Sequence, residues 1–300
     1  MPKKTDIGGQ AVIEGVMMRS KRDVVTAVRK KGKIVYKKDR LKKKPKFLEL
    51  FFIRGIVNLI EMLVIGIKTL NWSASQQVEE EEEELSSWTI LLTMVVAFAF
   101  ATVLFLFLPY ALTYLVGIRE NRNPVWFNII DGLIKVGILV LYVYLISLMK
   151  DIRRVFQYHG AEHKAVACYE DGKKLTPENA KKYSTLHPRC GTAFLMIVII
   201  VSVFLFSFIP IIVKSVYPGI DSLGSMLRRI IYFAVRIMSL PIVAGFSYEV
   251  LKLGSKNQDN PILRFMTAPG LWIQKITTRE PTKKQLEVGI AALKKVLKKG

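Results

Sequence analysis

The chain has 300 residues, of which 51% are hydrophobic, yet it carries a formal net charge of +21. These averages hide segregation, because long apolar runs alternate along the chain with very basic segments. This pattern favours an integral membrane protein with a positively charged aqueous face over a nucleic-acid-binding protein. The two cysteines, Cys168 and Cys190, are too few for a disulfide framework and exclude a small disulfide-stabilised domain.

The first segment, residues 1–46, is basic and is predicted to be a cytoplasmic β segment. Two apolar stretches, 24–28 and 34–36, flank a turn that contains Gly32, which is typical of a β-hairpin. Gly8 and Gly9 are expected in a tight turn rather than in a phosphate-binding loop, because neither GK[ST] nor G-x-G-x-x-G is present.

Residues 47–72 are apolar but interrupted by polar and charged side chains. Arg54, Asn58, Glu61 and Lys68 recur at intervals of four, three and seven, so they share one helical face. This spacing predicts an amphipathic helix. We expect it to lie in the membrane interface, or docked on the helical bundle, rather than to span the membrane.

An acidic linker and two pairs of apolar spans follow. The linker, residues 73–87, contains six consecutive glutamates, and a block of like charge is usually solvated. Residues 88–149 are predicted to hold the first two transmembrane helices, and residues 193–251 the next two. Asp131 and Lys135 lie four residues apart inside the second span, where they can neutralise each other.

The basic residues predict the orientation of these spans. Residues 1–46 hold 16 lysines and arginines, residues 149–192 hold nine and residues 251–300 hold 11, whereas the loops within each pair of spans hold few. Four spans place all three basic segments on one side of the membrane. The positive-inside rule predicts that this side is the cytoplasm.

The C-terminal region, residues 252–300, is predicted to be cytoplasmic and amphipathic. Thr282 and Gln285 have the spacing of a capping box. Four apolar residues then recur at the spacing of one helical face: Leu286, Ile290, Leu293 and Val296. We expect this last helix to dock on the protein or on anionic lipid.

The candidate chemistry lies in residues 150–192, which are predicted to form a cytoplasmic loop. All three histidines and both cysteines of the chain fall between His159 and Cys190. A helix would place His159 and His163 one turn apart on the same face, with Glu162 close beside them. The order H-x-x-E-H is the inverzincin signature.

These residue types predict a site for a divalent metal ion of the zinc type. His159 and His163 supply the first two ligands, and His187 is the preferred third. Cys190 is an alternative that favours a tighter, structural site. Glu162 is predicted to be the general base for an activated water, or a fourth ligand.

Several neighbouring residues have chemistry that suits a metal or catalytic site, and their types are compatible with more than one role. Arg189 or Lys164 could stabilise an oxyanion or a phosphate. Cys168 is expected to be a small buried apolar side chain. Glu249 fits an additional carboxylate at the metal, and it fits equally a membrane-surface carboxylate paired with Lys252. A purely structural polar network is the alternative interpretation of the whole histidine and cysteine set.

Five stretches of the sequence resemble the DUF1385 family of bacterial membrane proteins. They are residues 8–19 (GGQAVIEGVMMR), 159–164 (HGAEHK), 187–192 (HPRCGT), 269–274 (PGLWIQ) and 277–281 (TTREP). The resemblance extends over nearly the whole chain. It implies a multi-pass protein of the bacterial inner membrane and a metal-dependent enzyme, and it implies no particular substrate.

The expected fold is therefore mainly α: about four transmembrane helices, an interfacial amphipathic helix and a small β-structure, with both termini cytoplasmic. The leading hypothesis is a metal-dependent hydrolase of a membrane-associated peptide or lipid. The alternative is a non-enzymatic scaffold or regulator that binds a partner complex or anionic lipid through its basic segments. Membrane lipid is an expected partner in both cases, and nucleic acid is not.

Overall fold

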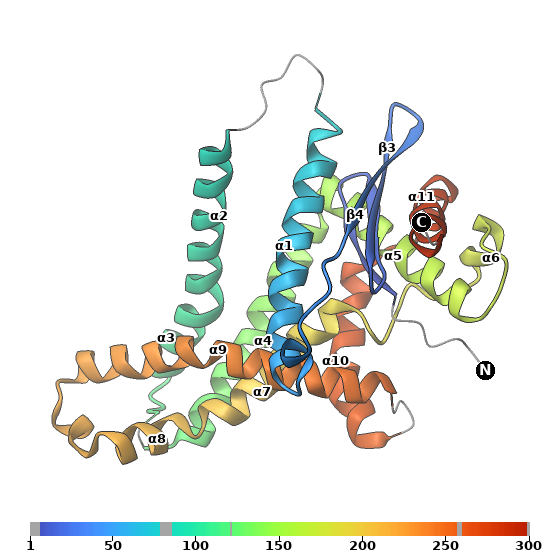
Figure 1. The fold of residues 1–300 in the computed structure, drawn as a ribbon. Coiled ribbons are helices and arrows are strands. Elements are labelled where there is room, and N and C mark those ends of the chain that lie inside the picture. Colours follow the sequence, from blue (N-terminus) through green and yellow to red (C-terminus); the bar gives the residue numbers. More distant parts are fainter. Residues whose placement is uncertain (1–6, 79–85, 121, 257–259, 299–300) are drawn as a thin grey trace.

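The computed structural model describes residues 7–78, 86–120, 122–256 and 260–298 (Figure 1). The chain is mainly helical and has one small antiparallel sheet near its N-terminus, as the sequence predicts. The run of six glutamates in the predicted linker lies outside the described residues.

The sheet is a meander in which each strand pairs with the next one along the chain. Its strands are β1 (Gly8–Val12), β2 (Gly15–Arg19), β3 (Asp23–Lys30) and β4 (Lys33–Arg40). The expected hairpin joins β3 and β4. Lys31 and Gly32 in its turn have φ angles of 45° and 82°, and positive φ at both central residues is what a type I′ turn requires.

Gly8 and Gly9 do not form the predicted tight turn, because both lie in β1. The turn that follows β1 instead contains Glu14, whose φ is 51°. Gly9 is required for close packing. A β carbon on it would overlap the carbonyl oxygen of Met17 and would lie 3.0 Å from Cγ of Glu162. The glycine thus allows the helix that carries Glu162 to lie directly against β1.

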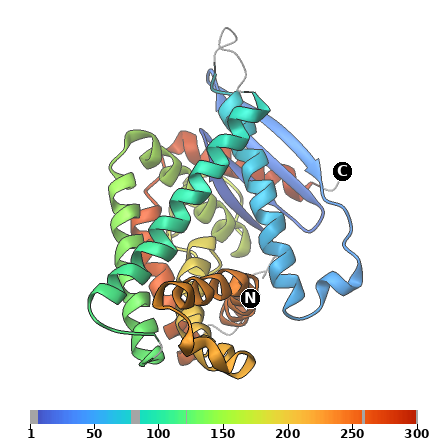
Figure 2. The ribbon, with the colours of Figure 1, turned by 90° about the vertical axis from the view of Figure 1, so that its left-hand side faces the viewer.

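Helices cover both faces of the sheet (Figures 1 and 2). They are α1 (Ile53–Ser75) on one face and α5 (Lys150–Glu170) with α11 (Lys283–Leu297) on the other. Successive strand side chains point to opposite faces, so Met17 packs toward α1, whereas Met18 packs toward α5 and α11. This three-layered unit contains a large share of the buried apolar side chains.

The predicted amphipathic segment at 47–72 is a 3-10 turn, Lys46–Glu49, followed by α1. Among the described residues, α1 is not one of the helices long and apolar enough to cross a membrane. It packs on the sheet and on a later helix, α9 (Ser225–Lys256). An ion pair between Glu61 and Arg19 joins α1 to β2. Docking on the protein, one of the two expected placements, is therefore what the structure contains.

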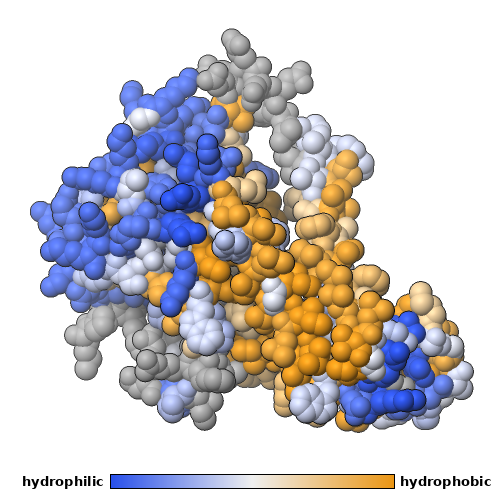
Figure 3. Space-filling view, turned by 180° about the vertical axis from the view of Figure 1, so that it is seen from behind, coloured by the Kyte–Doolittle hydropathy of each residue, from blue (hydrophilic) through white to orange (hydrophobic). Residues whose placement is uncertain are grey.

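In the part of the chain that the structure describes, three helical segments are long and apolar enough to cross a membrane by length and composition: Leu91–Leu115, Pro124–Ser147 and Ser225–Gly254. A fourth results if α7 (Gly191–Phe206) and α8 (Ile209–Val216), which meet at a bend of 41°, count as one span. The first segment comprises most of α2 (Ser87–Thr102), a π turn and α3 (Leu108–Leu115), and the second is α4. In Figure 3 apolar side chains form a broad band beside a hydrophilic region.

The histidine-rich segment at 150–192 is mostly helical, and His159 and His163 lie on one helix as their spacing predicts. It consists mainly of α5 and the short α6 (Pro177–Lys181). At the C-terminus, α10 (Pro261–Thr277) packs on α7. The capping box of Thr282 and Gln285 opens α11 as predicted. Its apolar face is buried against α5 and the sheet, so α11 docks on the protein.

Candidate metal centre

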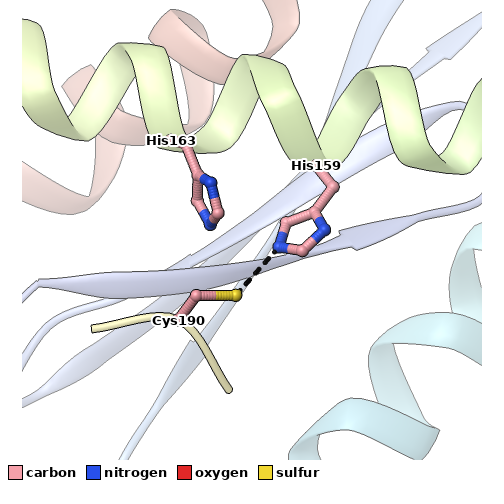
Figure 4. A group of neighbouring side chains, drawn as sticks. All are labelled: His159, His163 and Cys190. Carbon is pink, nitrogen blue, oxygen red and sulfur yellow. Dashed lines mark hydrogen bonds between the residues drawn. The ribbon is translucent and has the colours of Figure 1, made fainter. Parts of the chain in front are cut away.

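Two histidines on α5 share one face of the helix, as their spacing requires. The ring centroids of His159 and His163 are 4.4 Å apart (Figure 4). Neighbouring positions of α5 are buried against the sheet and α11, which limits the freedom of the backbone that carries both rings. The helix thus presents two imidazoles side by side.

Cys190 joins this pair from a distant part of the chain. It is the N-cap residue of α7, and its sulfur lies 3.2 Å from Nε2 of His159. One ligand atom from each of His159, His163 and Cys190 lies within 4.8 Å of the others. All three side chains point into the same space in Figure 4.

These separations fit a tetrahedral metal site. With metal–nitrogen and metal–sulfur bonds of about 2.0 and 2.3 Å, two such ligands lie roughly 3.5 Å apart. The distance from Cys190 Sγ to His159 Nε2 is close to this value. The other separations among the three ligand atoms are at most 4.8 Å.

The outer nitrogen of each histidine is held by a backbone carbonyl. Nδ1 of His159 lies 2.8 Å from the oxygen of Thr277, and Nδ1 of His163 lies 2.5 Å from the oxygen of Thr185. A carbonyl can only accept a hydrogen bond, so Nδ1 carries the proton in both rings. In the neutral imidazole this leaves the lone pair on Nε2, which is how protein histidines are prepared to bind metals.

The environment of Cys190 suits a sulfur that carries negative charge. Its Sγ accepts a hydrogen bond from the backbone N–H of Thr192 at 3.5 Å and lies 3.2 Å from the hydroxyl of Thr192. The N-terminus of a helix also favours a negative group placed on it. Position and hydrogen bonding therefore both suit Cys190 to the role of an anionic ligand.

Glu162 is buried beside the histidine pair. Its Oε2 lies 3.4 Å from Nε2 of His163, the nitrogen that the hydrogen bond to Thr185 leaves available. The close approach of β1 at Gly9 confines the Glu162 side chain. A carboxylate so near the ligand atom could bind the ion directly or accept a proton from a water held by the ion.

His187 lies close to this group but its nitrogens contact other residues. Its ring centroid is 5.5 Å from that of His163. Nε2 of His187 is 3.7 Å from a carboxylate oxygen of Glu170, and Nδ1 accepts from the backbone N–H of Arg189 at 3.4 Å. The structure therefore brings together His159, His163 and Cys190, with His187 outside that set.

Sequence comparisons place the chain in a family. A family model described as "Protein of unknown function (DUF1385)" matches residues 50–299. The chain belongs to the DUF1385 family. A relative, the uncharacterized protein YqhQ of Bacillus subtilis (strain 168), is 36% identical over 308 residues, which cover 97% of this chain and 92% of the relative. No solved structure matches the chain.

The matched region of this DUF1385 chain includes every residue of the candidate metal group and excludes the sheet at residues 8–40. The relative covers nearly the whole chain and so extends over the sheet as well.

Gln274 is a residue of the site that sequence reasoning missed. This fully buried side chain accepts from the backbone N–H of His187 at 2.8 Å and donates to the carbonyl of His187 at 3.0 Å. It thereby fixes the segment that carries Cys190, three residues later. The sequence does contain a signal for Gln274, because it is a polar residue among the apolar positions of the segment that forms α10.

Other predicted residues of the DUF1385 chain lie outside the metal group. Arg189 pairs with Glu170, and Lys164 donates to the carbonyl oxygen of Lys181 at 2.9 Å and pairs with Glu280 at 2.8 Å. Both cations are thus engaged elsewhere.

Glu249 accepts from Nε of Arg54 at 2.7 Å, at the junction of α1 and α9. Cys168 is buried as expected.

Burial and local charge alter the acidity of two groups near the metal group. Burial raises the pKa of the Cys168 thiol, with a further contribution from Asp171, so this sulfur is a poor nucleophile. Burial also acts to raise the pKa of Glu170. The hydrogen bond from His187 and the charge of Arg189 outweigh burial and hold that pKa below its usual range.

Proposed function

We propose that this DUF1385 protein binds a divalent metal ion of the zinc type through His159, His163 and Cys190. The observation that carries the proposal is the convergence of these side chains, with both Nδ1 atoms donating to backbone carbonyls. Three protein ligands leave one coordination position open, which is the pattern of catalytic rather than structural zinc. For His187 to serve as a ligand, its ring would have to turn away from Glu170.

We further propose that the protein is a multi-pass protein of the bacterial inner membrane, with the metal group at the cytoplasmic surface. The apolar helices support membrane insertion by their length and composition. The three basic segments support a cytoplasmic position for both termini and for α5. His159 lies nine residues after the start of α5, which is about 13 Å of helix beyond the end of α4.

The chemistry that this arrangement suits is hydrolysis. A bound divalent ion acts as a Lewis acid and makes water a usable nucleophile near neutral pH. Glu162 would accept the proton from that water, a role supported by its buried carboxylate beside His163. A position close to the membrane surface favours a membrane-associated peptide or lipid as the substrate.

Metal analysis of the purified full-length protein, loaded with Zn²⁺ and dialysed, tests the proposal. We expect about one equivalent of zinc in the native protein and in His187→Gln, and loss of it in His163→Ala and Cys190→Ser. Glu162→Gln should keep the metal if the glutamate acts as the base. Loss of zinc in His187→Gln together with its retention in Cys190→Ser would contradict the proposed ligand set.

The alternative, a membrane scaffold or regulator, would use the basic segments. The edge strand β4 exposes Lys33, Lys38 and Arg40, but charged side chains on an edge strand also prevent strand pairing between molecules. The exposed charges of β4 therefore fit the scaffold and the metal-dependent enzyme equally. A native protein that binds no zinc under the loading conditions would contradict the metal proposal and favour the scaffold.

A further inference from the structure

A cavity of about 400 Å³ lies at the far end of the helical bundle, where α3 ends, α4 begins and the chain enters α9. Four arginines line it: Arg119, Arg122, Arg228 and Arg229. Because α4 has 24 residues, this end is roughly 36 Å from the start of α5. Figure 3 shows a hydrophilic patch at this end (lower right), separated from the main hydrophilic surface by the apolar band.

The charge of this cavity is positive. Its lining contains one carboxylate, that of Glu120, which is buried and bonded to Arg236 at 3.0 Å. Arg236 is itself buried beneath the cavity, so the negative charge of Glu120 is already compensated. Of the four lining arginines, Arg228 lies 3.5 Å from Asp221 at the rim. The cavity therefore retains a net excess of guanidinium charge.

The clustering is unusual for this end of the molecule. Most of the other basic residues gather in three segments at the opposite side of the predicted spans, and the positive-inside rule predicts little positive charge here. Arg119 and Arg229 nevertheless hold their guanidinium carbons 3.6 and 3.9 Å from the centre of the same ring, that of Tyr114. Two like charges held on one aromatic ring repel each other, and an anion bound in the cavity that both arginines line would reduce that repulsion.

Buried polar atoms at the cavity also lack partners. The hydroxyl of Tyr232 and one oxygen of Glu120 have no hydrogen-bond partner among the described residues. Tyr232 is only 2% exposed and lines the cavity. A buried hydroxyl left unpaired costs about 1–3 kcal/mol. A ligand oxygen that accepts from Tyr232 would remove this cost.

An apolar hollow continues from the cavity. This second space, of about 360 Å³, shares Arg119 and Arg122 with the first and adds Trp126 and Ile130. Trp126 is largely exposed, and tryptophan prefers the depth of the lipid headgroups. A ligand that occupies both spaces would carry an anionic group at one end and a hydrocarbon chain at the other.

We propose that this cavity binds an anionic phospholipid, with its phosphate among the four arginines and an acyl chain against Trp126 and Ile130. Arginine is suited to phosphate because its planar fork donates two parallel hydrogen bonds. The proposal rests on the proposed membrane placement and is independent of the metal group.

Native mass spectrometry of the full-length protein in detergent tests this site with dioleoylphosphatidylglycerol as the probe. We expect one lipid to be retained preferentially. Arg122→Gln with Arg228→Gln should weaken its binding at least tenfold, and neither side chain is part of the buried network around Arg236. A matched variant with two exposed charges removed at the other end, Arg22→Gln with Lys33→Gln, should bind as the native protein does.

Three outcomes would overturn the proposal. One is equal binding by the Arg122/Arg228 variant. A second is equal binding of dioleoylphosphatidylcholine, which carries no net charge. The third is displacement of the lipid by millimolar inorganic phosphate in both native and Trp126→Ala proteins, which would identify a site for free phosphate. In the proposed site, Trp126→Ala weakens lipid binding and inorganic phosphate does not compete. Zinc removal should change none of these results.

Discussion

Gly160 and Arg279 pack so closely that a β carbon on the glycine would overlap the carbonyl oxygen of the arginine. The backbone N–H of Arg279 donates to the carbonyl of Phe156 at 2.9 Å, which joins the end of α10 to α5. Two residues earlier, the carbonyl of Thr277 holds Nδ1 of His159. The absence of a side chain at position 160 therefore permits the contact that orients the neighbouring histidine.

The first prediction concerns Gly160→Ala. Alanine in a helix is favoured over glycine by about 1 kcal/mol, but overpacking here costs about 1–3 kcal/mol. We expect net destabilisation, seen as a lower thermal midpoint in detergent, and at least tenfold weaker zinc binding. Gly137→Ala is the control, because nothing lies within 4 Å of a β carbon on that helical glycine. A Gly160→Ala protein as stable as the control variant would contradict the packing argument.

The second prediction concerns Gln274→Leu, which keeps the side-chain volume and removes both hydrogen bonds to the His187 backbone. Each unpaired buried backbone group costs about 1–3 kcal/mol, so the thermal midpoint should fall. Zinc affinity should fall about 10–100-fold, the usual effect of losing a group that supports a metal ligand. Isothermal titration with Zn²⁺ measures this. Unchanged affinity would show that Gln274 does not position Cys190, and the exposed Gln77→Leu serves as the control.

The third prediction separates the two cysteines by their reactivity. Burial raises the pKa of the Cys168 thiol. At pH 8 the folded protein should therefore react little with iodoacetamide at Cys168, whether zinc is bound or has been removed. Cys190 should be protected while zinc is bound and should become alkylated after treatment with EDTA. Peptide mass spectrometry reports both sites in one sample. Equal labelling of Cys190 before and after EDTA would argue against its role as a ligand.

The fourth prediction concerns stability at acidic pH. Burial acts to raise the pKa of Glu61, but the hydrogen bond from Lys44 and the charge of Arg19 outweigh burial, so the pKa in the folded state lies below its ordinary value of 4.5. Glu61 therefore contributes stability above about pH 4.5, and this contribution disappears as the pH falls through the lower, folded-state pKa. For a half-buried surface pair it amounts to about 1 kcal/mol or less.

Thermal midpoints of the native protein and of Glu61→Gln, measured from pH 7 to pH 3, test whether folding lowers the pKa of Glu61. The native protein should be more stable at pH 7, by about 2–4 °C at most, and the difference should shrink toward pH 3. Glu49→Gln, at an exposed glutamate in the preceding turn, should change little at any pH. A difference that grows as the pH falls would show that the pKa of Glu61 is raised rather than lowered in the folded state.

The sequence by itself determined the features that depend on neighbouring residues. The turn at Lys31 and Gly32, the capping box of α11 and the shared face of His159 and His163 all follow from local backbone geometry, which residue type and spacing encode. The apolar spans follow from composition. The family was recognisable from short motifs spread over nearly the whole chain.

Only the tertiary structure decided which distant residues meet. Cys190 reaches the histidine pair, whereas Glu170 and Arg189 engage His187, because the packing of α10 on α7 and the hydrogen bonds of Gln274 place that segment. Gly9 likewise lies in β1, where it pairs with Met18 and its lack of a side chain lets α5 approach. Such contacts join residues far apart in sequence, and periodicity carries no information about them. They depend on how whole faces of helices and strands exclude water together.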